Sequence, residues 1–306
     1  MTRMSQWKVS PDQSGIKLIA FLKSKLPKEV SSREVKRAIE AGDCQLNGKI
    51  ERFASRLVGT GDCITFMQSI KTPKNTFSIE DHILYIDDCL LAYNKPPGIN
   101  SEDPYLLKKL SEMYSSLTLL HRLDKQTTGV LLFARSENIS KLMLDLFKQR
   151  QISKTYLALV DGVPKETDGI IENYLGKLNV YEGQTLWGAV APEKGMLART
   201  TWHLKKSGEE ASLIECHPET GRTHQIRVHL SGLGHPILGD HQYGRSFHCQ
   251  HRPQRLMLHA AEIVFKHPAT GKLVAITSPI PQDFADACDA VTGQMERKQK
   301  NKDKIR

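Results

Sequence analysis

The sequence predicts an α+β protein in which a mixed, mostly antiparallel sheet follows a small α/β domain. Short apolar runs separated by Gly, Pro and Asn turns fill residues 77–292, with few helical periodicities between them. Residues 14–76 instead combine two amphipathic segments with a hairpin signal, and a polar connector at 68–77 separates the two regions. The basic end, residues 293–306, is expected to be disordered.

The first domain should open with two helices. Residues 16–26 place apolar side chains at near-helical spacing and stop before a proline. Ser31 and Ser32 offer an N-cap for a second helix over residues 33–42, which Gly42 closes. We therefore expect a helical pair ahead of the hairpin.

The polar side of that second helix carries Arg33, Lys36 and Arg37, which form a cationic ridge. Asn47-Gly48 then predicts a tight hairpin. The stretches "SSREVKRAIEAGDCQLNGKI" and "VGTGDCITF" resemble the S4 RNA-binding domain over about 60 residues. The resemblance implies a module that presents its second helix, and hence this ridge, to structured RNA. One departure is "GIKLIAFL", where the family usually opens with Arg-Leu-Asp.

The second domain consists largely of predicted strands. Ser136 should cap a helix, and a further helix from Thr223 should turn Ile226, Leu230 and Leu233 inward. The strand-like runs lie at residues 83–86, 89–95, 154–160, 199–206, 211–217, 256–265 and 272–278.

The formal net charge of +9 is concentrated at the two ends of the chain. Residues 14–75 hold 12 Lys/Arg and 6 Asp/Glu, and residues 296–306 hold 6 and 2, whereas residues 77–292 hold 23 and 25. A polyanion such as RNA would then be held mainly by the ends. The alternative is that the basic tail is merely solvated.

Cellular context follows from what the sequence lacks. No apolar run approaches the ~20 residues of a membrane span, and the first 13 residues contain no apolar signal stretch, so a cytoplasmic protein is expected. The six cysteines are scattered and should remain reduced. The segment His248-Cys249-Gln250-His251 lacks a second ligand pair at zinc spacing, so we expect a surface loop there and no metal.

The stretch 121-HRLDKQTTGVLLFARS-136 raises the question of function. Arg122 and Asp124 are two residues apart, so on an extended segment both side chains point to one face. Gly129 permits a turn before an apolar strand that would anchor the loop. Spacing alone leaves two interpretations, a structural salt bridge or a catalytic carboxylate held in place.

The segment "HRLDKQTTG" resembles the HRLDxxTSG signature of pseudouridine synthases of the type that modifies large-subunit ribosomal RNA and transfer RNA. Further blocks of that family follow in order and together cover nearly all of residues 80–280: "NKPPG", "KTYLALVDG", "ETGRTHQIRVHLSGLGHPILGD", "YG" and "LMLHAAEIVFKHPATG". Thr128 stands where serine is commoner, and "GINS" follows where many members have a histidine.

The resemblance implies isomerisation of uridine in RNA without a cofactor. The catalytic aspartate maps onto Asp124, its expected cation onto Arg227, and the active-site aromatic residue onto Tyr156. A carboxylate suits this chemistry because cleavage of a glycosidic bond develops positive charge on the sugar. The expected substrate contacts are Arg122, which could occupy the space that a flipped base leaves, together with Leu258, Lys95, Arg222 and His224.

The resemblance also sets the alternatives. Members with this N-terminal module mostly act on large-subunit ribosomal RNA, which we expect as substrate, with transfer RNA as the alternative. A non-catalytic RNA-binding or ribosome-assembly protein is disfavoured because the aspartate, tyrosine and arginine occur together. A hydrolytic glycosidase is disfavoured because no second carboxylate lies in the HRLD loop. We expect a monomer with RNA as partner, and no membrane association.

Overall fold

The structure is a computed structural model that describes residues 3–27, 30–68, 79–115, 117–181, 184–244 and 246–293. Its contacts divide the chain into two compact units, Met1–Ser78 and Ile79–Arg306. Residues 294–306, which include the predicted disordered tail beyond Gly293, lie outside the described part. Among the described helices, none combines the length and apolar character needed to cross a membrane.

The helices of the N-terminal unit are α1 (Leu18–Lys25) and α2 (Ser32–Ala41), close to the predicted positions. Ser31 caps α2: its side chain accepts a hydrogen bond from the Glu34 amide at 3.2 Å, and the Glu34 carboxylate accepts one from the Ser31 amide at 2.6 Å. This reciprocal capping box satisfies two amides that the first helical turn leaves unpaired. Gly42 ends the helix with a φ of 95°, which favours glycine.

The described part of this unit contains a four-stranded antiparallel sheet in the order β1-β4-β2-β3. Its strands are β1 (Arg3–Lys8), β4 (Cys63–Gln68), β2 (Cys44–Leu46) and β3 (Lys49–Ile50). Asn47 and Gly48 have φ values of 52° and 78°, so the predicted tight hairpin is present. The predicted start of the domain at residue 14 is wrong, because β1 pairs along its whole length with β4.

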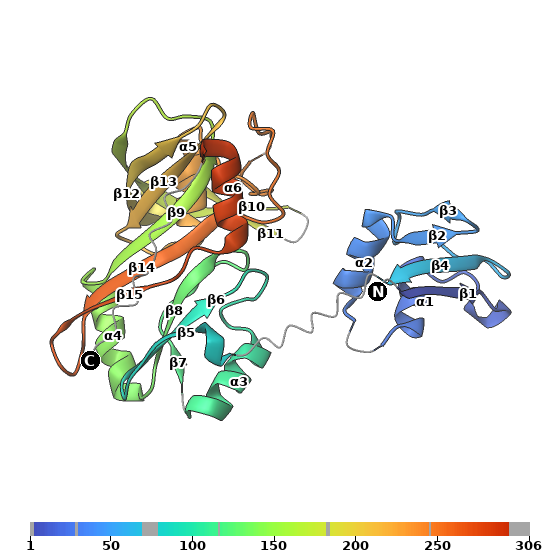
Figure 1. Cartoon of the computed structure of the whole chain (residues 1–306), viewed down its shortest axis with the longest axis horizontal. Coiled ribbons are helices and arrows are strands. Elements are labelled where there is room, and N and C mark those ends of the chain that lie inside the picture. Colours follow the sequence, from blue (N-terminus) through green and yellow to red (C-terminus); the bar gives the residue numbers. More distant parts are fainter. Residues whose placement is uncertain are drawn as a thin grey trace. The chain divides into compact units, whose positions relative to one another are not determined.

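The larger unit is built on a mixed sheet that contains eleven strands among the described residues (Figure 1). The order is β11-β10-β12-β13-β9-β14-β8-β6-β5, with β15 added to β14 and β7 to β8. Only the pairing of β14 with β8 is parallel among the described strands, which confirms the predicted α+β class. The bounds are β5 Ile83–Ile86, β6 Leu90–Lys95, β7 Thr118–Leu119, β8 Thr128–Ala134, β9 Ser153–Asp161, β10 Asp168–Tyr181, β11 Gln184–Val190, β12 Met196–Ser207, β13 Ala211–Pro218, β14 Leu258–Lys266 and β15 Leu273–Thr277.

The α-helices described in this unit are α3 (Pro104–Tyr114), α4 (Glu137–Lys148), α5 (Gln225–Gly232) and α6 (Gln282–Thr292). Short 3₁₀ turns occupy Pro11–Gln13, Glu80–His82 and Pro192–Lys194. Ser136 caps α4 as predicted. Leu233 was expected to point inward, but it follows the last residue of α5 and is 36% exposed.

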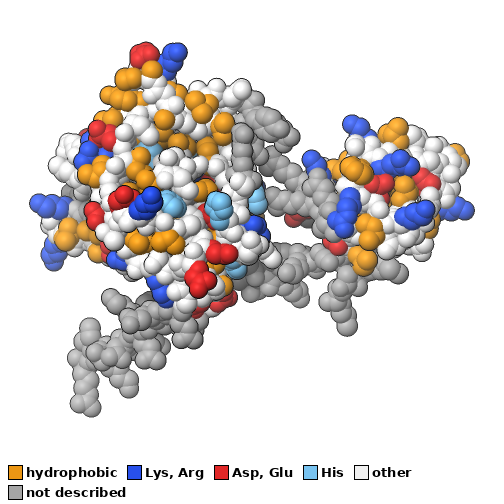
Figure 2. Space-filling model, turned by 90° about the horizontal axis from the view of Figure 1, so that it is seen from above, with side chains coloured by type: hydrophobic (Ala, Val, Ile, Leu, Met, Phe, Trp, Pro, Cys, Tyr) orange, Lys and Arg blue, Asp and Glu red, His pale blue; other side chains and the backbone are white. Residues whose placement is uncertain are grey.

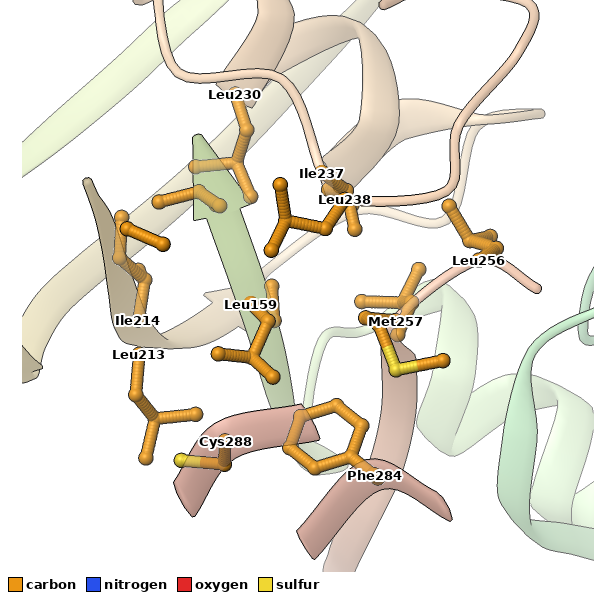
Figure 3. Close-up of a cluster of buried hydrophobic side chains, with 14 of the residues drawn as sticks. Leu159, Leu213, Ile214, Leu230, Ile237, Leu238, Leu256, Met257, Phe284 and Cys288 are labelled. Atoms are coloured by element: carbon orange, nitrogen blue, oxygen red, sulfur yellow. The ribbon is translucent and has the colours of Figure 1, made fainter. Parts of the chain in front are cut away.

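One apolar cluster holds the strands and helices that carry the site together (Figure 3). Leu159 of β9, Leu230 of α5 and Phe284 of α6 all belong to it. Burying such side chains stabilises the fold by roughly 1.5–3 kcal/mol each. The shared core therefore fixes α5 against β9. The separation between a side chain on α5 and a side chain on β9 is fixed as a result.

The start of β8 is fixed just as firmly. Gly129 has a φ of 113°, and a Cβ atom there would lie 2.1 Å from the carbonyl oxygen of Ala260. Thr128 Oγ1 lies 2.9 Å from His259 Nδ1. Only glycine permits the close approach of β8 to β14, and this approach anchors the loop that ends at Thr127.

Candidate active site

A wide cleft in the larger unit has a volume of about 2260 Å³. Its walls come from the loop before β8, the ends of β9 and β11, and the segment 219–242 around α5. The volume exceeds the ~300–1,000 Å³ typical of small-molecule pockets. The cleft is therefore large enough for a segment of a macromolecule.

Asp124 lies in this cleft on the loop between β7 and β8. Its carbonyl oxygen accepts a hydrogen bond from the Thr127 amide at 3.0 Å, and its side chain is 26% exposed. The neighbouring Leu123 is buried, and both its amide and its carbonyl bond to the Ser101 hydroxyl, at 2.8 and 2.9 Å. The Asp124 carboxylate thus faces the cleft, while the hydrogen bonds between Leu123 and Ser101 hold the backbone of the same loop in place.

The cation expected beside Asp124 is present. Arg227 Nη1 lies 3.1 Å from Asp124 Oδ2, while Nε and Nη2 bind the two carboxylate oxygens of Asp240 at 2.7 and 2.9 Å. Nη2 also donates to Gln242 at 3.0 Å, and the guanidinium stacks on Tyr243 at 4.9 Å. Burial opposes the charge of Arg227, but its hydrogen bonds to Asp240 and the carboxylate charges outweigh burial and raise its pKa. The guanidinium stays charged and has little freedom to turn away from Asp124.

Tyr156 stands on β9 and lines both the cleft and its small inner pocket, which Asp124 also lines. Burial, with a contribution from the charge of Asp124, raises the pKa of Tyr156, so its phenol is protonated at neutral pH. Leu258 on the adjacent strand β14 is buried, 4% exposed, and lines the same inner pocket. The site thus combines an aromatic ring and an aliphatic side chain near one carboxylate, a setting suited to a planar base.

His224 precedes α5 with a φ of 56° and also lines the cleft. Its Nε2 lies 3.9 Å from Asp124 Oδ1 and its Nδ1 lies 2.8 Å from the Tyr243 hydroxyl. Burial lowers the pKa of His224 despite the nearby Asp124 charge, so a neutral imidazole is favoured at neutral pH. Arg222 lines the cleft as well, and its Nε donates to the carbonyl of Leu197 at 3.0 Å.

Arg122 is held far more loosely than Arg227. Its side chain is 65% exposed, and Nη1 lies 3.8 Å from a carboxylate oxygen of the equally exposed Glu102. An exposed pair of this kind contributes little to stability, on the order of 0–1 kcal/mol. The side chain therefore remains available to a ligand in the cleft.

Lys95 was predicted to contact substrate, and that prediction is wrong. The side chain is fully buried, and Nζ donates to the carbonyls of Pro96, Ile99 and Lys125 at 3.0, 2.9 and 3.2 Å. It does not line the cleft. The lysine turns back into the loops that follow β6 and joins them, so its role is structural.

The predicted cationic ridge on α2 is described only in part. Lys36 is exposed, whereas the side chains of Arg33 and Arg37 lie outside the described residues. On the face visible in Figure 2, the N-terminal unit carries Lys and Arg side chains with apolar side chains between them. Its exposed large apolar residues include Ile50, Phe53 and Leu57.

The sequence predictions assigned no role to Asp240, Gln242, Tyr243 and Lys154, all of which take part in the site or its support. Asp240 lies in the family block "GHPILGD" and Tyr243 in the block "YG". The blocks were therefore a usable signal for both residues. Lys154 gave a weaker signal, since it opens the block that also holds Tyr156.

The charge of the cleft differs from that of the domain as a whole. Residues 77–292 hold slightly more Asp/Glu than Lys/Arg, but the cleft wall has seven cations and four carboxylates. The cations are Arg122, Lys125, Lys148, Arg150, Lys154, Arg222 and Arg227, and the carboxylates are Glu102, Asp124, Glu219 and Asp240. A cleft with this balance favours an anionic ligand.

Potential metal ligands gather elsewhere. Asp87, Cys89 and His267 are the group of three whose ligand atoms lie within 4.8 Å of one another in the described part of the chain. Asp87 Oδ1 accepts hydrogen bonds from the amides of Cys89 and Leu90 at 2.8 Å, and Oδ2 lies 2.9 Å from His267 Nε2. The carboxylate is thus occupied by protein donors, and the group does not line the cleft.

Comparison with known proteins connects this geometry to a family. The family model described as RNA pseudouridylate synthase matches residues 89–232. The chain is 32% identical over 295 residues to the ribosomal large subunit pseudouridine synthase C of Haemophilus ducreyi, covering 89% of this chain and 91% of the relative. It is also 32% identical to the ribosomal large subunit pseudouridine synthase D of Zymomonas mobilis, covering 83% of this chain and 87% of that one.

A solved structure agrees with the sequence matches. The human RNA pseudouridylate synthase domain containing 1 superposes with a TM-score of 0.58 at 30% identity, covering 67% of this chain and 86% of that chain. Asp124, Tyr156 and Arg227 all lie within residues 89–232, which the family model matches, whereas Asp240 and Gln242 follow that segment.

Proposed function

Because the chain belongs to the RNA pseudouridylate synthase family, we propose that it isomerises uridine to pseudouridine in structured RNA and that this RNA is large-subunit ribosomal RNA. The relatives at about 30% identity are named for the large ribosomal subunit. Their names support this substrate over transfer RNA. Two differently designated synthases match equally well, so the modified position has to be mapped directly.

The isomerisation breaks the bond between N1 of uracil and C1′ of ribose and forms a bond between C5 and C1′. C5 loses a proton and N1 gains one, so the reaction is redox-neutral and requires no redox cofactor. As N1–C1′ breaks, positive charge develops at C1′, and a carboxylate can stabilise that charge or trap the sugar covalently. Asp124 is the residue that we assign to this step.

The observation that carries the proposal is the position of Asp124, which is open to the cleft and paired with Arg227 at 3.1 Å. The second carboxylate, Asp240, holds the guanidinium from behind with two hydrogen bonds. This arrangement holds a cation against Asp124 and orients its carboxylate before substrate arrives. Preorganised charge of this kind is usually the largest contribution to catalysis.

Tyr156 and Leu258 would hold the uracil ring between them while it is detached from the ribose. Tyr156 is protonated at neutral pH, so it would act as a stacking surface and a hydrogen-bond donor. The phenol could accept the C5 proton only after a base had removed its own proton. The target uridine must leave its stack to reach the inner pocket. In this proposal the exposed Arg122 would fill the space that the base vacates.

The N-terminal unit would supply additional RNA affinity. Its α2 helix carries Lys36 on an exposed face, and its sequence resembles the S4 domain. Binding by such a surface depends on phosphate neutralisation. In this proposal the cleft selects the uridine, while the N-terminal unit adds affinity that does not depend on local sequence.

Asp124→Asn tests the catalytic assignment directly. The amide keeps the shape of the side chain but removes the charge, and we expect pseudouridine formation to fall by at least ~10³-fold while RNA binding persists. The assay is the conversion of ribosomal RNA fragments, read by the release of the C5 hydrogen from labelled uridine. Asp286→Asn, an exposed acid on α6 outside the cleft, serves as the matched control and should retain full activity.

Two outcomes would contradict the proposal. Undiminished turnover by Asp124→Asn would show that another group carries the chemistry. Conversion of transfer RNA but not ribosomal RNA by the wild-type protein would overturn the substrate, and mapping pseudouridines in cells with and without the gene would then identify the true target.

A further inference from the structure

Lys154 stands two residues before Tyr156 on β9, so the two side chains project from the same face of the strand. Both line the cleft and its inner pocket. Lys154 Nζ donates to the carbonyl oxygen of Thr220 at 3.1 Å, its one acceptor among the described residues. An ammonium group has three donors, so two remain for a ligand.

Arg222 lines the same cleft and stands two residues after Thr220, the acceptor of the Lys154 ammonium, on the loop that precedes α5. Its Nε donates to the Leu197 carbonyl at 3.0 Å, while its terminal nitrogens have no acceptor among the described residues. The loop itself is rigid: the buried Gln225 accepts hydrogen bonds from the Arg222 amide at 3.0 Å and from the Thr220 hydroxyl at 2.6 Å. The two cations are therefore held on a fixed frame.

The carboxylates of the cleft do not neutralise these two cations. All four pair with other cations: Glu102 with Arg122, Glu219 with Arg199, and both Asp124 and Asp240 with Arg227. Among the described residues, Lys154 and Arg222 form no salt bridge. Burial lowers the pKa of Lys154 to about 8, and the charge of Arg222 contributes in the same direction.

We propose that Lys154 and Arg222 form a binding site for one phosphodiester of the RNA, adjacent to the nucleotide whose base lies against Tyr156. The inference rests on the proposed function, which places RNA in the cleft. A phosphate offers two free oxygens, which suit the planar guanidinium fork and the ammonium together. Because Lys154 and Tyr156 are two residues apart on one strand, about 7 Å, the phosphate lies within one nucleotide of the target base.

The first test needs only the wild-type protein. RNA fragments that are converted by the enzyme are prepared with a single neutral methylphosphonate either 5′ or 3′ to the target uridine, and their dissociation constants are measured over a range of salt. One of the two replacements should weaken binding about 10-fold and reduce the salt slope by about one. If neither replacement matters, the phosphate site does not exist.

The second test combines the RNA change with a protein change. Lys154→Met keeps the aliphatic stem, and we expect it to bind unmodified RNA about 10-fold more weakly than the wild type does. The methylphosphonate that weakens binding by the wild type should cause no further loss of affinity in this variant. Lys154→Arg should restore affinity. Lys141→Met, on the exposed face of α4 outside the cleft, is the matched control and should bind both RNAs like the wild type.

The outcomes are distinguishable. If the same methylphosphonate still lowers the RNA affinity of Lys154→Met, that phosphate is bound elsewhere and the inference is overturned. A thermal melt identifies a variant that has merely lost its fold, in which case Arg222→Gln replaces it in the same cycle. If the wild-type protein converts no RNA at all, the proposed function fails, whereas conversion without phosphate sensitivity sinks only this inference.

Discussion

Two lysines of this protein, the buried Lys95 and the partly buried Lys154, differ in the partners of their ammonium groups. Both stand on strands of the same sheet, and burial lowers the pKa of Lys95 to about 7 and that of Lys154 to about 8. Lys95 gives hydrogen bonds to three carbonyl oxygens and lies outside the cleft. Lys154 has one described acceptor and faces the cleft.

The difference shows that a buried charge must be interpreted through its partners. An ammonium whose donors are all satisfied by backbone carbonyls organises the loops around it and has nothing left for a ligand. An ammonium with unsatisfied donors next to a second cation is costly in the free protein. Binding an anion removes that cost, so the unsatisfied lysine is the better candidate for substrate recognition.

The largest expected effect is a difference in protein stability between the variants of the two lysines. Lys95→Met leaves three carbonyls without their donor, and we expect the free energy of unfolding to fall by about 3 kcal/mol. Lys154→Met removes one such bond together with the repulsion from Arg222, so the change should stay below about 1 kcal/mol. Urea unfolding at pH 7 measures the free energy of unfolding of both variants. Equal losses of stability would contradict the different roles assigned to the two lysines.

The next effect is on the pH dependence of RNA binding. The pKa of Lys154 is lowered to about 8 in the free protein, where Arg222 and His121 face it, so the ammonium loses its proton as the pH rises from 7 to 9. A bound phosphate favours the charged form, so affinity should fall about 10-fold over that range. Lys154→Arg should bind equally well at both pH values, since a guanidinium stays charged.

A pH profile that Lys154→Arg shares with the wild type would assign the titration to another group. The control is Lys272→Met, a change at an exposed turn outside the cleft, which should leave the profile unaltered.

The sequence was most informative where local chemistry and local structure coincide. The capped helix α2, the Asn47-Gly48 hairpin and the pairing of Arg227 with Asp124 were all predicted, because each depends on short motifs with a strict geometric requirement. The family motifs brought together residues 103 positions apart, which spacing alone cannot do.

Elsewhere the hydrophobic pattern gave too little signal. Strand β10 was not predicted, because it exposes Ile170 and Leu178 by more than half and so lacks a clean alternation. Strand β1 has no regular apolar alternation: it pairs with β4 through its backbone and packs Trp7 against the core. Helix α3 had usable signals, since Asp103 caps it and proline follows, but the prediction did not use them.

The lysines mark a different limit. Lys95 and Lys154 each lie at or near the start of a family block, and nothing in the sequence tells which long side chain turns back into its own loops and which extends into a cleft. That choice depends on where the acceptors lie in the fold: Lys95 combines two carbonyls of its own loop with that of the distant Lys125, whereas the acceptor of Lys154 is the distant Thr220.

The smallest expected effect tests the side from which a phosphate approaches Lys154. A Cβ atom at Gly221 would lie 4.0 Å from Nζ and within 4 Å of nothing else, so Gly221→Ala should change the free energy of unfolding by less than ~0.5 kcal/mol. The added methyl group would nevertheless crowd the ammonium, and RNA affinity should fall about 2- to 3-fold. Gly232→Ala, at the end of α5 with no atom within 4 Å, is the matched control. Unchanged affinity in the Gly221 variant would mean that the anion reaches the lysine away from the 220–222 loop, and Arg222 would then no longer be its partner.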